Sequence, residues 1–174
     1  MIEGLEPVSL QELRVLGGPK HWSVEGKLDA LPSLTPVRGQ ISAEHKGNVL
    51  AVEGRLETIV TLCCDRCLND YNHKLQASPR ELIWLGESPP SEDDLQESEE
   101  IAALDGLVES LDPRGDFVPE QWVFEQLNLQ LPVVNHCGEH CPGPPGLNQN
   151  TPVAESDSPR TDPRWDALRR LQQP

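Results

Sequence analysis

Residues 46–67 read KGNVLAVEGRLETIVTLCCDRC and contain the clearest strand pattern in the chain. After a turn at residues 46–48, every second side chain is apolar or small, and most of those between are charged or polar. This alternation is typical of a β-strand with one face on a core and the other in water. The predicted strand leads directly to the pair Cys64 and Cys67. Its inward-facing set is Leu50, Val52, Gly54, Leu56, Thr58, Val60 and Leu62.

Neighbouring segments with the same period of two predict further strands around this one. Residues 22–30 and 37–43 alternate before it, and residues 72–85 are expected to return along it as a hairpin partner. The short connections between these segments favour antiparallel pairing. The sequence therefore predicts an antiparallel sheet or a small barrel.

Two other segments have helical character. Ser9 and Glu12 have the spacing of a capping box, which predicts a short helix over residues 9–16. A second helix is expected to begin at Pro119, to end before Pro132 and to cover the sheet. Its apolar residues recur at helical spacing: Val123, Phe124, Leu127 and Leu131. The predicted fold class is α+β, with one or two helices on the sheet.

The charge of the chain is strongly negative and unevenly distributed. The formal net charge is -15 over 174 residues, and residues 81–125 contain 14 acidic side chains against one basic side chain, Arg114. Because nucleic-acid affinity depends on Lys and Arg displacing counterions, an evenly spread negative charge would repel RNA. Residues 86–100 predict an acidic, mobile loop. The alternative interpretation is an acidic docking surface for a basic partner.

The length of the chain fits one domain with additional unstructured residues. We expect a single domain over residues 1–141, followed by a flexible linker over 142–161 that is rich in Pro, Gly, Asn and Ser. Residues 162–172 predict a short amphipathic helix that docks on its own domain or on a partner. Its signals are Asp162 as the cap, Pro163 at the first position, and the apolar stripe Trp165, Leu168 and Leu171.

Targeting signals and membrane segments are not predicted. The N-terminus lacks the pattern of a secretion signal, and no apolar run approaches the roughly 18 residues of a membrane span. The expected location is the cytoplasm. Because that compartment is reducing, the five cysteines favour metal binding or redox chemistry over disulfide bonds.

Two pairs of cysteines predict a structural zinc site. Cys64 and Cys67 follow the central strand, and Cys137 and Cys141 follow the second helix. Four thiolates from these pairs would complete the tetrahedral coordination of one zinc ion and staple the helix end to the sheet. His136 and His140 are alternatives, because either imidazole could replace Cys137 as a ligand.

The remaining cysteine chemistry leaves one more alternative open. Cys63 lies on the opposite strand face from Cys64 and is interpreted as a small buried hydrophobic residue. A redox dithiol of Cys64 and Cys67, with the thiolate favoured by Arg66, is disfavoured because no βαβ pattern surrounds it. Catalytic zinc is also disfavoured, since four thiolates leave no position for water. The chain is therefore not expected to be an enzyme.

Three motifs in this order resemble the YceD family of large ribosomal RNA subunit accumulation proteins. They are the strand 50–62 running into CDRCL at 64–68, LPVV at 131–134 before CGEHC at 137–141, and DPRWDAL at 162–168. The family's cysteines map onto Cys64, Cys67, Cys137 and Cys141. Many relatives carry another cysteine pair before a Gly-x-Asn-Leu-Asn segment. Here residues 142–148 keep Gly-Leu-Asn without a cysteine, so the second cluster is reduced.

The resemblance implies a non-enzymatic factor for the accumulation of large-subunit (23S-type) ribosomal RNA, in RNA processing or subunit assembly. The expected partner is the large-subunit ribosomal RNA precursor or a basic ribosomal protein. The sequence contains no arginine-rich strip with interleaved aromatic residues, so no motif of this kind favours direct RNA binding. Two alternatives stay open: a zinc-stapled protein-binding adaptor unrelated to ribosomes, and a Cys-x-x-Cys thiol redox protein.

Overall fold

The structure is a computed structural model that describes residues 2–86 and 109–144. The chain divides into one compact unit over Met1–Pro142 and a second over Gly143–Pro174, of which only residues 143 and 144 are described. The predicted acidic loop over 86–100, apart from residue 86, the linker beyond residue 144 and the helix over 162–172 lie outside the described residues.

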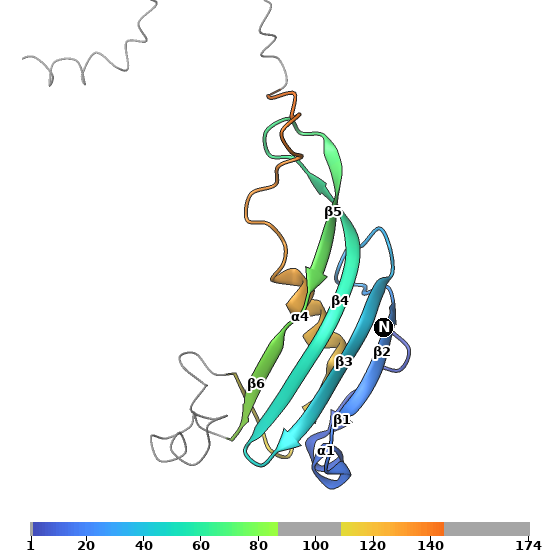
Figure 1. Cartoon of the computed structure of the whole chain (residues 1–174), viewed down its shortest axis with the longest axis vertical. Coiled ribbons are helices and arrows are strands. Elements are labelled where there is room, and N and C mark those ends of the chain that lie inside the picture. The colour runs from blue at the N-terminus through green and yellow to red at the C-terminus, as the bar shows by residue number, and fades with distance from the viewer. Residues whose placement is uncertain (1, 87–108, 145–174) are drawn as a thin grey trace, which may run out of the picture. The chain divides into compact units, whose positions relative to one another are not determined.

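The main sheet has six strands built around one long strand, β4 (Figure 1). Its order is β2-β3-β4-β6-β7, with β5 paired to β4 beside β6, and all pairs are antiparallel except the parallel pair β6–β7. In the described part of the chain the sheet is open, with β2 at one end and β7 at the other, so the small-barrel alternative is wrong. The strands are β2 Lys20–Gly26, β3 Val37–Lys46, β4 Val49–Cys63, β5 Asp70–Ala77, β6 Arg80–Leu85 and β7 Ser110–Leu111.

The long strand β4 confirms the pattern read from residues 50–62. Its predicted inward-facing residues are buried or half-buried, whereas Glu53 and Glu57 face water and pair with Arg80 at 3.1 Å and Lys74 at 3.0 Å. The predicted hairpin partner returns along β4 as two strands, β5 and β6. They are separated at Pro79, which has no N–H to donate to a ladder.

Two of the predicted boundaries are wrong. The strand expected over residues 22–30 ends at Gly26, although Leu28 remains buried in the loop that follows. The helix expected to continue up to the residue before Pro132 is α4 (Pro119–Asn128), which ends four residues before that proline. After Asn128 the backbone tightens into i→i+3 bonds, such as the one that Leu131 N donates to Asn128 O at 3.1 Å.

The predicted N-terminal helix is confirmed as α1 (Leu10–Leu16), which ends at Gly17 with a φ of 65°. Ser9 caps it, because its Oγ accepts a bond from Gln11 N at 3.2 Å. Glu12 does not close the capping box and instead pairs with Lys20 at 2.7 Å. The strand β1 (Val8–Ser9) precedes α1 and pairs with β8 (Asp116–Phe117), next to the start of α4.

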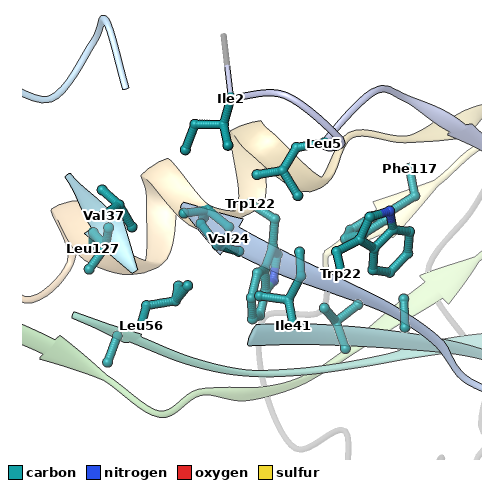
Figure 2. Close-up of a cluster of buried hydrophobic side chains, with 14 of the residues drawn as sticks. Ile2, Leu5, Trp22, Val24, Val37, Ile41, Leu56, Phe117, Trp122 and Leu127 are labelled. Carbon is teal, nitrogen blue, oxygen red and sulfur yellow. The ribbon is translucent and has the colours of Figure 1, made fainter. Parts of the chain in front are cut away.

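The hydrophobic core lies between α4 and the inner face of the sheet. Figure 2 shows Trp122 pointing from α4 toward Ile41 on the sheet. Gly54 of β4 makes this close approach possible: a Cβ atom there would lie 3.0 Å from Ile41 Cγ2 and 3.0 Å from a ring carbon of Trp122. The helix therefore covers the sheet, as predicted. The core also contains Ile2, Leu5, Val24, Val37, Leu56, Val123 and Leu127.

The outer half of β4 forms an arm with β5 that extends beyond the end of β3. The last β3–β4 pair is Arg38 with Glu57, and past it the edge of β4 is covered by residues 33–35. Leu34 N donates to Ile59 O at 2.7 Å. In Figure 1 the chain after α4 runs back to the end of this arm. The fold thus brings the two cysteine-containing segments to one tip.

Candidate metal centre

The first cysteine pair sits in a tight turn at the end of the β4–β5 arm. Cys64 N donates to Asn69 O at 2.9 Å, and Leu68 N donates to Cys64 O at 2.9 Å. Leu68 has a φ of 62°, a left-handed conformation that turns the backbone back toward β5. Cys64 and Cys67 are both buried. The turn therefore directs both thiols to the inside of the tip.

The second cysteine pair is placed beside this turn by a reciprocal pair of hydrogen bonds. Asp65 N donates to Asn135 O at 2.9 Å, and Asn135 N donates to a carboxylate oxygen of Asp65 at 2.7 Å. Two residues later the chain reaches Cys137, and Cys141 N donates to Gly138 O at 3.2 Å to close a second turn. Asp65 thus aligns two segments that are 70 residues apart.

The four thiols of Cys64, Cys67, Cys137 and Cys141 converge. All four sulfur atoms lie within 4.8 Å of one another, with 3.9 Å between Cys64 Sγ and Cys141 Sγ and 3.7 Å between Cys67 Sγ and Cys137 Sγ. In a tetrahedral site with Zn–S bonds near 2.3 Å, neighbouring sulfurs are about 3.8 Å apart. The arrangement could hold a metal ion, and its donor set and spacing fit zinc.

The electrostatics of the cluster also favour a cation. The pKa of Cys64 is lowered to about 6, chiefly because Cys67 N–H donates to its sulfur, aided by the N–H groups of Arg66 and Cys137. Burial and the neighbouring thiols raise the pKa of Cys137 to about 12. The Asn69 N–H and the Cys137 thiol lower the pKa of Cys67, but burial and the thiols of Cys64 and Cys141 outweigh them, so that this pKa is raised. A divalent cation would remove this mutual repulsion and stabilise four thiolates.

The structure brings Cys137, rather than either histidine, to the other three cysteines. His136 Nδ1 accepts a hydrogen bond from Gly138 N at 3.2 Å, and the side chain is exposed. His140 is also exposed. The interpretation in which an imidazole replaces Cys137 therefore has no support in this geometry.

The prediction for Cys63 is wrong, because its side chain is exposed. Alternation along β4 does place it on the opposite face from Cys64, as expected. That face of the arm continues the water-facing side of the sheet, where Thr61 is also exposed. Burial of a small apolar thiol would require an element packed on that side.

Sequence reasoning missed the residues that hold the centre together. Asp65 and Asn135 were not identified, although Asp65 lies between the first two cysteines. The conformation of Leu68 was also missed, since a left-handed position is usually signalled by Gly or Asn. Nothing in a leucine marks such a position.

A family model described as large ribosomal RNA subunit accumulation protein YceD matches residues 52–172. The chain belongs to the YceD family. The match confirms the resemblance and includes all four cysteines of this YceD chain. No curated protein and no solved structure matches it. Within the residues that the structure describes, none of the helices has the length and apolar character needed to cross a membrane.

Proposed function

We propose that this YceD family member is a non-enzymatic factor needed for large-subunit (23S-type) ribosomal RNA to accumulate, acting in RNA processing or subunit assembly. The observation that carries the proposal is the family match, whose description refers to large ribosomal RNA subunit accumulation. This match covers the arm, the tip and the helix α4. The partner would be the ribosomal RNA precursor or a protein bound to it.

The proposal includes one structural zinc ion held by Cys64, Cys67, Cys137 and Cys141. When bound, zinc would supply charge compensation and a cross-link between two distant segments. Four thiolates fill its coordination sphere and leave no open position at which water could be activated. This closed ligand set supports a structural rather than a catalytic role.

The thiol redox alternative has one observation in its favour, the pKa of about 6 at Cys64, which makes a thiolate available near neutral pH. Metal analysis of the purified chain separates the two functions. Structural zinc predicts one ion per chain and four cluster thiols that react only after chelation, whereas the exposed thiol of Cys63 reacts throughout. A redox dithiol predicts metal-free protein whose Cys64–Cys67 pair cycles with a reductant.

The proposed function is tested in cells that lack the chain. We expect the ratio of large-subunit to small-subunit ribosomal RNA to fall and to recover when the full chain is supplied. Tagged full-length chain should sediment with precursor particles of the large subunit. An unchanged RNA ratio, together with a chain that stays at the top of the gradient, would favour the adaptor unrelated to ribosomes.

A further inference from the structure

Exposed apolar side chains gather at the tip that contains the four-cysteine cluster. In the described part of the chain, Leu68 is 62% exposed, Val133 is 101% exposed and Val134 is 68% exposed. We name these three residues the tip surface. Exposed apolar side chains that gather in one region of a soluble protein mark contact sites more often than scattered ones do.

The tip surface is held in place by the same bonds that assemble the metal centre. Val133 and Val134 directly precede Asn135, which is paired in both directions with Asp65. Leu68 closes the first cysteine turn through its bond to Cys64 O. The two segments are therefore fixed next to each other, so that the tip surface needs little further ordering when a partner binds.

Leu68 combines exposure with an unfavourable backbone. A left-handed conformation disfavours any side chain with a Cβ atom, and Gly would adopt it freely. An exposed leucine at this position does not contribute to the core. The turn needs the left-handed backbone but not a leucine side chain, so an exposed leucine at this position supports a contact outside the chain.

The charges around the tip decide what kind of partner fits. Residues 62–73 and 129–144 contain three carboxylates, Asp65, Asp70 and Glu139, against one guanidinium, Arg66. Four thiolates around one divalent cation would add two more negative charges. Phosphate groups would be repelled by this field, whereas a basic protein surface would be attracted.

Base stacking on the tip is also disfavoured. Tyr71 is the one aromatic residue in these two segments other than histidine, and it is half-buried with its ring edge-on to His73 at 6.3 Å. Single-stranded RNA binding normally requires several exposed aromatic side chains along a basic groove. Valine and leucine side chains suit an apolar hollow on a protein.

We infer that the tip surface docks on a basic protein of the large ribosomal subunit, with Leu68, Val133 and Val134 entering an apolar hollow that has a positively charged rim. This inference rests on the proposed function and names the partner class for it. The net charge of -15 of the whole chain would steer such a partner toward it.

The double variant Val133→Asp/Val134→Asp tests the inference, with Val15→Asp as its control. Val15 is 87% exposed and lies on α1, outside the tip. The full-length chains are immobilised and exposed to the proteins extracted from purified large ribosomal subunits, and separately to protein-free large-subunit RNA. The wild type should retain a basic protein at low salt. The double variant should retain at least about tenfold less of this protein than the wild type does. Val15→Asp should retain as much as the wild type. Retention should also weaken with salt.

Leu68→Gly separates docking from a structural role. We expect its melting temperature to stay unchanged or to rise by up to about 3 °C, because Gly relieves the left-handed strain. Retention of the basic protein should nevertheless fall severalfold. A lower melting temperature with unchanged retention would assign Leu68 to the fold and overturn its place in the tip surface.

The outcomes distinguish this inference from the proposed function. Three outcomes would each overturn the docking inference. They are a wild type that retains RNA alone, a wild type that retains no protein, and a double variant whose oligomeric state has changed. The proposed function would still be supported if the full chain restored the ribosomal RNA ratio. If the double variant restored that ratio as well as the wild type and retained the same protein, only the tip surface would fail.

Discussion

Cys67→Ser is expected to lose the bound metal and to lower the free energy of unfolding by more than about 3 kcal/mol. Cys67 is buried and its sulfur lies 3.7 Å from that of Cys137. A serine hydroxyl is a poor zinc ligand, and the three remaining thiols would again repel one another as they ionise. Metal content by mass spectrometry and denaturant unfolding measure the two effects.

The matched control is Cys63→Ser, four residues away in the same arm. Cys63 is exposed and does not belong to the four-sulfur cluster. We expect this variant to keep one metal ion per chain and the stability of the parent. Equal metal content in the two variants would contradict the proposed ligand set, and equal unfolding curves would contradict a stapling role for the metal.

The loss in Cys67→Ser should start at the tip. The cysteines lie outside the main hydrophobic cluster, which packs between α4 and the sheet. We therefore expect amide hydrogen exchange to accelerate first in residues 64–69 and 135–141, while β3 and the inner half of β4 stay protected. Addition of a chelator to the wild type should reproduce this pattern and should leave the variant unchanged.

Gly39→Ala is expected to lower the free energy of unfolding by more than about 3 kcal/mol, or to prevent folding. Gly39 lies on β3 opposite Leu56 of β4. A Cβ atom there would overlap the carbonyl oxygen of Arg55, lie 2.9 Å from its carbonyl carbon and lie 3.0 Å from Leu56 Cα. These contacts are backbone atoms of a central strand, so the two strands would have to separate.

Gly18→Ala is the control for this substitution. No heavy atom lies within 4 Å of a Cβ atom at Gly18, so alanine fits without displacing a neighbour. Its stability should be unchanged or higher by up to about 1 kcal/mol, because alanine restricts the unfolded chain. Thermal unfolding of both variants provides the measurement. A Gly39→Ala variant as stable as Gly18→Ala would show that β3 and β4 do not approach this closely.

The sequence pattern was most informative where local chemistry and burial agree. Along β4 the alternation of side chains has the same period as the pleat, so the inward and outward faces followed directly. Ser9 was predictable as a helix cap because its hydroxyl satisfies a backbone N–H only two residues away. The two cysteines of each pair were predictable as neighbours because only two or three residues separate them in the sequence.

Features that depend on distant residues were not predictable in this way. The end of α4 at Asn128 is a case, since Leu131 has helical spacing but packs against the core from a tighter turn. Cys63 is another, because alternation gives the face of a strand but does not say whether another element covers that face.

The amino-acid sequence by itself therefore determined the central strand, the two cysteine pairs, the family and the α+β class of this protein. Only the tertiary structure decided that the sheet is open, that Cys137 rather than a histidine completes the sulfur cluster, and that Asp65 aligns the two turns on Asn135. The physical reason is one of range. Side-chain periodicity and capping act over a few residues, whereas the four-sulfur cluster depends on hydrogen bonds between segments 70 residues apart.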